Sequence, residues 1–394
     1  MPDFARGREP GITEVVELTP TGRGAVAVVL VAGPDAVRIV DECFAPASGR
    51  RLADVPLEQI AFGRLGGPGG EEVVVCRRAE EQVEVHTHGG SAAVDALIAR
   101  FVDAGCRRAS WPQWLRGKHH DPIRAAAQIA LADAPTARTA AILLDQYHGA
   151  LTNAVHAAGA ALRAANWTGA IATIEAVLAH RDVGLHLTTP WHVVITGPPN
   201  VGKSSLINSL AGFQRSIVSR EPGTTRDVVT TTTAIDGWPV QLADTAGVRD
   251  PKDELESAGI ELAAKMLEAA DLVVVVRDAT QPLDHPDSET IAPVISRSAA
   301  RQHIIRVWNK IDLVSAPKAE RMIHTSAVTG EGIADLIAAI GSELVPLAPA
   351  PGSAVPYTGK QVAQLEAALA AAKAHDAAAG LAALQSLLDS SVLL

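Results

Sequence analysis

The sequence has little of several residue types whose absence excludes whole classes of protein. Aromatic residues make up only 3% of the 394 positions, so we expect a core of aliphatic side chains. The three cysteines, Cys43, Cys76 and Cys106, are too few and too widely spaced for a disulfide framework, and we interpret them as buried free thiols. No stretch is long and apolar enough to cross a bilayer, and the opening MPDFARGREPG has no apolar signal core. The sequence therefore predicts a cytoplasmic protein that does not enter a membrane.

A surplus of basic residues is also missing. The formal net charge is −10, which excludes a global positive field that would attract nucleic acid without sequence preference. One local stretch, CRRASWPQWLRGKHHDPIR (106–124), combines five Arg or Lys residues with two tryptophans. Such a stretch suits RNA or a polyglutamated folate, and it equally suits a solvated basic face over packed tryptophans. The sequence leaves both interpretations open.

The hydrophobic pattern changes along the chain and indicates three kinds of structure. Residues 1–118 mix strand-like and helix-like segments, which predicts an α/β domain. Residues 119–187 form consecutive alanine-rich helical segments, and 346–394 give a proline-rich linker followed by more helix. Residues 188–345 alternate strand and helix, which predicts a mostly parallel sheet. The fold class is therefore α/β, with one domain (188–345) inserted into a helical domain.

A glycine-rich loop in the inserted domain has the pattern of a phosphate-binding site. GPPNVGKS (197–204) follows the apolar strand VVIT and begins the helix SSLINSLAG, which is the context that GxxxxGK[ST] requires. Its backbone N–H groups would surround phosphates at a helix N-terminus. We expect Lys203 to neutralise the β/γ-phosphates and Ser204 to bind Mg²⁺. The loop residues expected to contact the nucleotide are Asn200, Val201, Gly202, Lys203, Ser204 and Ser205.

Three further motifs follow in chain order and predict that the nucleotide is GTP or GDP. GTTRD (223–227) has the place of a first switch, in which Thr224 contacts the nucleotide and Thr225 binds Mg²⁺ and the γ-phosphate. In DTAG (244–247), Asp244 would hold Mg²⁺ through water, and the Gly247 N–H would meet the γ-phosphate. The domain is thus predicted to be a Ras-like P-loop GTPase domain that hydrolyses GTP to GDP and phosphate.

The base-recognition motif is NKID (309–312). Asp312 can accept hydrogen bonds from two adjacent N–H donors of guanine, an arrangement that adenine does not offer. Asn309 and Lys310 belong to the same motif, and Ser326 and Ala327 follow as a candidate contact for guanine O6. The motif therefore predicts a preference for GTP over ATP.

With these motifs in place, the chain resembles the MnmE (TrmE) family of tRNA-modification GTPases. The resemblance also rests on TGRGAVAVVLVAGP (21–34), EVHTHGG (84–90) and WLRGKHHDPIRAAAQIALADA (114–134), and it covers roughly residues 15–380 in the family's order. It implies a role in modification of the tRNA wobble uridine (U34). It also implies a flavin-containing partner of the MnmG (GidA) type and a homodimer held through the first domain.

The resemblance also implies how water is activated. DTAGVRD (244–250) is not followed by the glutamine that orients water in Ras. In the family, two GTPase domains meet around K⁺ ions instead. Asn200 matches the K⁺ ligand and Glu256 the residue that positions the water, so Glu256, Lys203 and Thr225 form the expected catalytic set. Each match has a structural alternative, Asn200 as a turn former and Glu256 as an acidic residue in the first turn of a helix.

The first domain of the family binds a tetrahydrofolate derivative, and this chain keeps only part of that site. Glu84 and Lys118 match two of its polar residues, but Leu30 stands where the family has an arginine. We therefore expect folate binding to be weakened or rearranged. The alternative interpretation is that Glu84 is a solvated strand residue and Lys118 a surface charge, and His86 and His88 are expected to be structural.

A second departure concerns the tail. Family members carry a cysteine near their C-terminus, whereas no cysteine follows Cys106 here, and we expect the second part of the helical domain to be truncated. Together with Leu30, this favours an alternative function, a regulatory or assembly GTPase without modification chemistry. A pseudo-GTPase that only binds partners is disfavoured by the intact set Lys203, Ser204, Thr225, Asp244 and Asp312.

Overall fold

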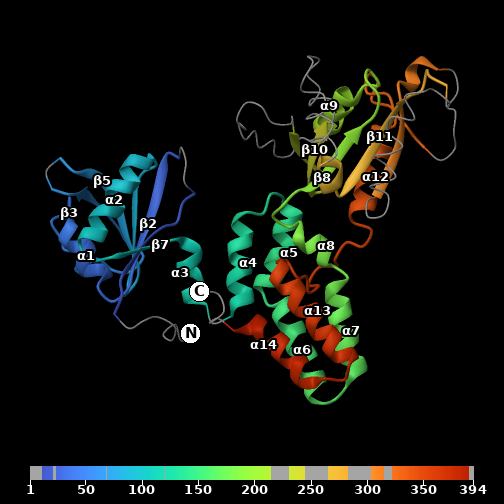
Figure 1. Cartoon of the computed structure of the whole chain (residues 1–394). Coiled ribbons are helices and arrows are strands. Elements are labelled where there is room, and N and C mark those ends of the chain that lie inside the picture. Colours follow the sequence, from blue (N-terminus) through green and yellow to red (C-terminus); the bar gives the residue numbers. More distant parts are fainter. Residues whose placement is uncertain are drawn as a thin grey trace. The chain divides into compact units, whose positions relative to one another are not determined.

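The computed structural model describes residues 11–20, 24–67, 69–119, 121–213, 230–244, 265–282, 303–314 and 322–389. The chain forms two compact units, the first reaching Ala125 and the second running from Ala126 to Leu388. The first unit is a sheet with helices, and the second contains a helical region and another sheet (Figure 1). Within the described ranges, no helix has both the length and the apolar character needed to cross a bilayer.

The first unit is built on a seven-stranded sheet in the order β3-β4-β5-β6-β2-β1-β7. Its neighbouring strands are antiparallel, except that β1 and β7 run parallel. The strands are β1 (Glu14–Glu17), β2 (Val26–Ala32), β3 (Phe44–Pro46), β4 (Ile60–Leu65), β5 (Glu71–Ala79), β6 (Gln82–His88) and β7 (Arg107–Ala109). The helices of this unit are α1 (Ala36–Cys43), the short η1 (Leu52–Asp54), α2 (Ser91–Asp103) and α3 (Trp111–Lys118).

The two faces of this sheet differ. α1 and α2 cover one face, and their apolar residues form a common core with inward residues such as Val29, Val75 and Val85. On β4 the residues alternate strictly between buried and exposed, the pattern of a strand with one face in water. Ile60 is 75% exposed and Phe62 is 54% exposed on that outer face. Ile60 and Phe62 therefore form an exposed apolar part of this outer face, next to the exposed Arg64.

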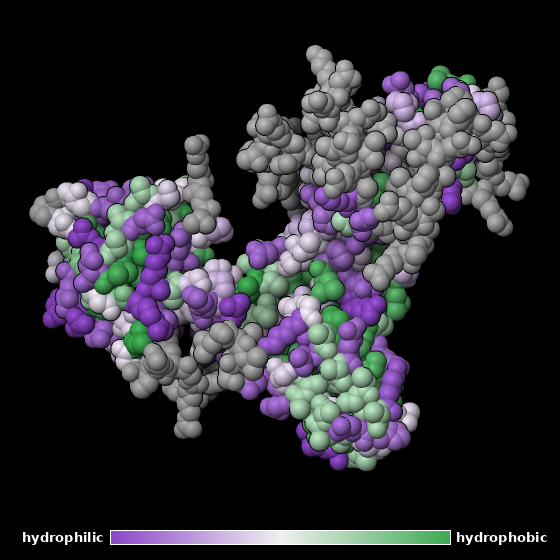
Figure 2. Space-filling model, viewed as in Figure 1, coloured by the Kyte–Doolittle hydropathy of each residue, from purple (hydrophilic) through white to green (hydrophobic). Residues whose placement is uncertain are grey.

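The helical region of the second unit combines segments from both sides of the inserted domain. Its helices are α4 (Pro122–Ala132), α5 (Ala137–Tyr147), α6 (Ala150–Arg163), α7 (Trp167–Leu178), α8 (Arg181–Leu185), α13 (Gly359–Lys373) and α14 (Ala377–Leu388). α13 packs on α7 and α14 packs on α6, although about 200 residues separate them in sequence (Figure 1). The pale green that dominates the lower part of this region in Figure 2 reflects its alanine-rich surface.

The second sheet has six strands in the order β13-β12-β11-β8-β10-β9. All neighbours are parallel except β9 and β10, which form a hairpin. The strands are β8 (Trp191–Thr196), β9 (Thr230–Ile235), β10 (Trp238–Asp244), β11 (Leu272–Asp278), β12 (His303–Asn309) and β13 (Ile323–His324). α9 (Lys203–Phe213) and α12 (Ile333–Leu344) accompany the sheet, and η4 (Ile311–Leu313) follows β12. The first five residues of β11, LVVVV, are all buried, as expected for a strand in the middle of a parallel sheet.

The helical region meets this sheet where the chain enters it. The His186 ring stacks on Trp191 with centroids 3.6 Å apart and planes at 9°. The His192 N–H donates to Asp271 Oδ2 over 2.7 Å, and His186 Nε2 lies 3.4 Å from the same oxygen. Burial by itself raises the pKa of Asp271, but the hydrogen bonds and charges of the two histidines outweigh it and hold the pKa below its ordinary value. These contacts lie at the amino ends of β8 and β11.

The predicted fold class is confirmed. An N-terminal α/β domain precedes a helical region, and a P-loop domain with a mostly parallel sheet is inserted into that region.

Candidate nucleotide site

The described residues of the predicted motifs lie at one edge of the second sheet. β8, β10 and β12 run in the same direction, so their carboxyl ends share that edge. The glycine-rich loop follows β8, Asp244 ends β10 and Asn309 ends β12. Ligands of open parallel sheets bind outside these carboxyl ends, so the arrangement has the geometry of a ligand site.

Two positions of the loop require glycine because atoms of the neighbouring strands lie very close to the loop backbone. Gly197 has φ +155° and a Cβ there would lie 2.3 Å from the Val276 carbonyl oxygen. Gly202 has φ +93° and a Cβ there would lie 2.4 Å from Asn309 Nδ2. Only glycine fits either position without displacing a neighbour, so the loop packs directly on β11 and β12.

Lys203 is held inside the loop that precedes it. Its side chain is buried, and its Nζ donates to the carbonyl oxygens of Gly197 and Pro198 over 3.0 and 2.8 Å. Because a buried ammonium group needs partners of negative potential, these carbonyls fix its place in the loop. A phosphate bound by the loop would therefore meet a positive charge already in position.

Ser204 and Asp244 bring two oxygen ligands together. Ser204 Oγ donates to Asp244 Oδ2 over 2.7 Å, and Asp244 is only 6% exposed. Mg²⁺ prefers oxygen ligands and is commonly held by one or two protein groups, with phosphate and water completing its shell. In the part of the chain that the structure describes, no three His, Cys, Asp or Glu side chains gather into a metal site of their own. The two side-chain oxygens thus fit a Mg²⁺ ion whose coordination is completed by nucleotide phosphates and water.

Asn309 joins the phosphate loop to the segment that follows β13. It is 2% exposed, and its Nδ2 donates to the Val201 carbonyl over 2.9 Å. Its Oδ1 accepts from the Ala327 N–H at 3.2 Å and from Thr325 Oγ1 at 3.3 Å. The side chain therefore bonds to both segments, and its contribution to a ligand site is to hold these segments together.

The other predicted base-recognition residues lie in two segments. Lys310 and Asp312 follow Asn309, and Ser326 and Ala327 follow β13. Asp312 lies in η4 with an exposed side chain, two residues after Lys310, whose φ is +65°. Ser326 is fully buried, and its Oγ accepts from the Thr329 N–H over 3.1 Å. The Ala327 carbonyl accepts from Ser209 of α9 over 3.1 Å, which ties this segment to the helix after the phosphate loop.

Asp278 belongs to this group although sequence reasoning did not select it. Its Oδ2 lies 2.7 Å from Lys310 Nζ, and its Oδ1 accepts from the Thr280 N–H and Oγ1. Burial raises the pKa of Asp278, but the Lys310 and Thr280 hydrogen bonds outweigh burial and hold the pKa below its ordinary value. Asp278 ends β11, and the pairing of β11 with β12 brings it beside Lys310, which follows Asn309 at the end of β12.

Four predicted residues lie outside the described ranges. They are Thr224, Thr225, Gly247 and Glu256. Asn200 is described, is exposed and has φ +62°, a conformation that asparagine tolerates better than most residues. This backbone conformation agrees with the turn-former interpretation and leaves the side chain accessible to a ligand.

The predicted folate residues have partners within the first unit. Glu84 on β6 lies 3.5 Å from the guanidinium of Arg78 and 3.5 Å from His86 Nε2. Leu30 is buried and stands directly beside Glu84 in the β2–β6 register. Lys118 at the end of α3 lies 4.8 Å from the ring centre of Trp114. Arg78, which the sequence did not single out, therefore supplies a guanidinium next to Glu84 from a different strand.

The basic stretch is largely engaged in contacts of its own. Arg107 lies 2.9 Å from Glu14, and Arg108 lies 3.5 Å from Asp95. Trp114 is only 8% exposed. Its ring therefore packs inside the unit, which favours the structural interpretation of this stretch over a stacking surface for bases.

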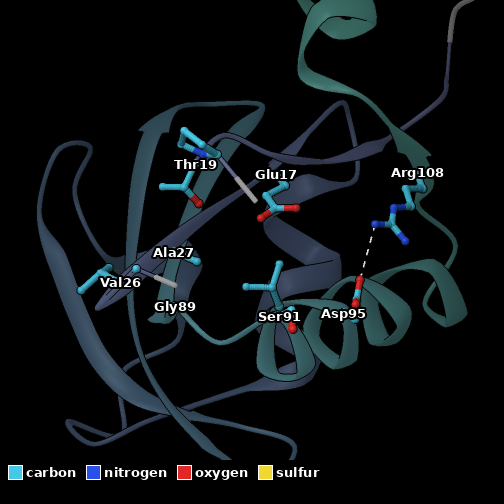
Figure 3. Close-up of a pocket in the computed structure, with 11 residues that line it drawn as sticks. Glu17, Thr19, Val26, Ala27, Gly89, Ser91, Asp95 and Arg108 are labelled. Atoms are coloured by element: carbon cyan, nitrogen blue, oxygen red, sulfur yellow. Dashed lines mark hydrogen bonds and ion pairs between the residues drawn. The ribbon is translucent and has the colours of Figure 1, made fainter. Parts of the chain in front are cut away.

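A small cavity of about 60 Å³ lies in the first unit, at the N-terminus of α2. Figure 3 shows Glu17 and Thr19 on one side of it, Ser91 and Asp95 on α2, and the Arg108–Asp95 ion pair at its rim. Gly89 of the HTHGG segment also lines it, whereas Glu84 and Lys118 do not. The cavity is thus separate from the predicted folate residues.

Two family models match the chain. "GTP-binding protein TrmE N-terminus" matches residues 15–112, and "50S ribosome-binding GTPase" matches residues 192–310. A crystal structure of Era with MgGDPNP and a segment of 16S ribosomal RNA is 31% identical, covering 41% of this chain and 58% of that chain. Its TM-score of 0.33 is too low to support an argument of its own.

Relatives over most of the length carry one name, "tRNA modification GTPase MnmE". The protein of Chloroflexus aurantiacus is 32% identical over 372 residues, which is 83% of this chain and 80% of the relative. The protein of Nitratidesulfovibrio vulgaris is 30% identical over 405 residues, covering 90% of this chain and 86% of the relative. The two matched domains and these relatives agree with the motif order, and the chain is a GTP-hydrolysing enzyme that belongs to the MnmE family of tRNA modification GTPases.

Proposed function

We propose that this MnmE-family GTPase couples GTP hydrolysis to modification of the tRNA wobble uridine. The observation that carries the GTP-hydrolysing part of the proposal is the 2.7 Å contact between Ser204 and Asp244, because it joins the phosphate loop to the second switch motif beside the buried Lys203. Residues of two distant motifs meet there as a Mg²⁺–phosphate site requires. The tRNA role is inferred from the relatives named tRNA modification GTPase MnmE.

In this proposal the site binds the two ends of GTP with different segments. The N–H groups of residues 200–205 and Lys203 hold the phosphates, and Ser204, Asp244 and Thr225 hold Mg²⁺, which offsets charge on the transferring phosphoryl group. Asp312 and Lys310 bind the guanine, with residues 326–327 at its edge. The Gly247 N–H and Thr224 contact the γ-phosphate side. Isothermal titration with GDP and with ADP tests this, and equal affinity for the two would contradict it.

We also propose that hydrolysis is stimulated by K⁺. Asn200 is exposed at the loop, so its side-chain oxygen is accessible to a cation beside the phosphates. Glu256 would position the attacking water in place of the missing glutamine. The test compares GTP hydrolysis in potassium chloride and in sodium chloride at equal ionic strength. A gain in potassium that is lost in Glu256→Ala supports the proposal, whereas equal rates in both salts contradict it.

The homodimer belongs to the same proposal. Ile60 and Phe62 expose apolar side chains on the outer face of the first sheet, and Leu57 nearby is 46% exposed. An apolar patch of this kind is typical of a surface that is covered by another subunit. Sedimentation equilibrium should give a dimer, and Phe62→Glu should give a monomer with the same circular dichroism spectrum.

Modification itself would require tRNA and the flavin-containing MnmG (GidA)-type partner. Nucleoside analysis of tRNA from a deletion strain tests the role, because U34 modification should be lost. Leu30 favours the second candidate, a regulatory or assembly GTPase without this chemistry, since a buried leucine replaces the arginine of the folate site. Unchanged U34 in the deletion strain would support that second candidate.

A tetrahydrofolate derivative is proposed only as a ligand of a rearranged site. Glu84 already has Arg78 and His86 at 3.5 Å, so a folate would have to share or displace these partners. Fluorescence titration with 5-formyltetrahydrofolate tests it, with Glu84→Gln as the comparison. A cytoplasmic location is proposed from the thiols, since Cys43, Cys76 and Cys106 are all unpaired.

A further inference from the structure

The β9–β10 hairpin connects the two switch motifs and also touches the helical region. β9 begins three residues after GTTRD (223–227), and β10 ends in Asp244, the first residue of DTAG. Six residue pairs, from Ala243–Thr230 to Trp238–Ile235, hold the two strands together. At about 3.3 Å per residue, the hairpin reaches roughly 20 Å from the candidate nucleotide site to its turn.

The turn of this hairpin is tight. It has only two residues between the paired ends, and both adopt positive φ, +49° at Asp236 and +76° at Gly237. Two-residue turns of this kind match the twist of the flanking strands. Among the described strands, β9 is at the edge of the sheet, so no described strand pairs with the other side of the hairpin. Movement of the hairpin along its length would therefore be passed to the turn.

The N-terminal end of α5 forms hydrogen bonds with this hairpin turn. Thr136 Oγ1 donates to the Gly237 carbonyl over 2.7 Å and at the same time accepts from the Thr139 N–H, so it also caps α5. The Arg138 guanidinium reaches both carboxylate oxygens of Asp236 at 3.1 and 3.4 Å and lies 5.0 Å from the ring centre of Trp238. One helix end thus contacts three consecutive residues of the hairpin.

The last turn of α5 holds the chain where it returns to the helical region. Gln146 is fully buried, and its amide donates to the Ser353 carbonyl over 3.0 Å and accepts from the Val355 N–H over 3.1 Å. Asp145 accepts from the Gly352 N–H over 2.8 Å. α5 has 11 residues, so it places these two sets of contacts about 16 Å apart.

We propose that α5 acts as a strut, a rigid helix that transmits nucleotide-dependent displacement of the β9–β10 hairpin to residues 352–355. These residues bring the chain back to the helical region, so the displacement reaches that region. This proposal rests on guanine-nucleotide binding at the site proposed above. Thr136 and Arg138 receive the displacement of the hairpin, and Gln146 passes it to the returning chain. Because coupling of this kind is reciprocal, breaking the α5–hairpin contact must alter the relative affinities for GTP and GDP.

The test uses full-length variants that leave the helix cap intact. Thr136→Asp still caps α5 but has no hydroxyl to donate to Gly237, whereas Thr136→Asn keeps both the cap and a donor. Thr136→Asp combined with Arg138→Ala removes the contact. Arg181→Ala is the matched control, because Arg181 pairs with Glu366 at 3.1 Å within the helical region and away from the hairpin.

The measurements are dissociation constants for GDP and for a non-hydrolysable GTP analogue, together with amide exchange of α5 and residues 352–355 in both states. We expect the affinity ratio to change at least about threefold in the double variant and to stay unchanged in the asparagine and control variants. We also expect the exchange difference between the two states to disappear in the double variant. If the wild-type protein binds both nucleotides, an unchanged affinity ratio in the double variant would overturn the strut. Identical amide exchange of the wild-type protein in the two nucleotide states would overturn it as well. Wild-type protein that binds neither nucleotide would instead refute the proposed nucleotide site on which the strut depends.

Discussion

Replacing Asn309 by alanine should damage the frame of the nucleotide site even before a ligand is bound. The change removes three hydrogen bonds and takes away the Asn309 partner of the buried Val201 carbonyl and of the half-buried Ala327 N–H. A net hydrogen bond contributes about 0.5 to 1.5 kcal/mol, and each buried group left unpaired costs about 1 to 3 kcal/mol. Because partial relaxation will recover some of this, we expect a loss of about 2 to 4 kcal/mol in the free energy of unfolding of the GTPase domain.

The size of the domain converts this loss into a measurable shift. For domains of 150 to 250 residues, about 1 kcal/mol corresponds to roughly 2 to 4 °C in the unfolding midpoint, so the variant should melt about 5 to 15 °C lower. The chain has more than one domain, so a single transition cannot be assumed. Hydrogen exchange of peptides from 197–210 and 322–330 should therefore be followed beside the thermal scan, and both should lose protection.

Two comparison variants separate this effect from general destabilisation. Asn309→Asp keeps the oxygen that accepts from Ala327 but places a second oxygen against the Val201 carbonyl in a buried place, so it should be at least as destabilised as the alanine variant. Asn166→Ala removes the cap of α7, where Asn166 Oδ1 accepts from the Gly169 N–H over 3.0 Å, and should loosen only the helical region. An alanine variant at position 309 with unchanged protection in both segments would refute the positioning role of this side chain.

Three further predictions follow from the charges and thiols. Asp278→Asn should raise the dissociation constant of GDP about tenfold while leaving kcat at saturating GTP unchanged, because it weakens the charge-assisted bond that orients Lys310. The pKa of Asp271 is held low by its contacts with His186, so its stabilising effect is present above about pH 4 and is lost as the pH falls through the lowered folded pKa. Thermal scans should accordingly show the difference between wild type and Asp271→Asn shrinking below about pH 4. Burial raises the pKa of Cys106 to about 11, so at pH 8 only about one thiol in a thousand is ionised and alkylation by iodoacetamide should be slow, as measured by mass spectrometry.

Each of these has an outcome that contradicts it. A fall in kcat for the Asp278 variant with an unchanged GDP affinity would mean that the carboxylate acts on the reaction and not on Lys310. A difference between wild type and Asp271→Asn that grows on acidification would reverse the sign of the linkage. Alkylation of Cys106 in the native protein at the rate found in urea would show that burial does not control this thiol.

The phosphate loop and the core strands could be predicted from the sequence because their determinants are local. GPPNVGKS needs its glycines for backbone conformation and close approach, and LVVVV is apolar throughout because a middle strand of a parallel sheet is buried on both faces. The contact between Ser204 and Asp244 could also be foreseen, since carboxyl ends of parallel strands meet at one edge.

Other features depended on contacts between segments far apart in the chain. Asp278 holds Lys310 only because β11 and β12 are neighbours, and Arg78 reaches Glu84 because β5 pairs with β6. The α5–hairpin contact joins Thr136 to Gly237 across 101 residues, which no local pattern encodes.

The sequence by itself therefore determined the element types, the order of the nucleotide motifs and the family, because periodicity and short motifs act over a few residues. Only the tertiary structure decided the other contacts between distant side chains, such as Asp278 with Lys310 and Arg78 with Glu84. Long-range pairing depends on the register and order of strands and on which helix ends reach which turns, and these are set by the packing of the whole domain. That is why the phosphate-loop motif could be recognised in the chain, whereas Asp278, Arg78 and the contacts of α5 could not.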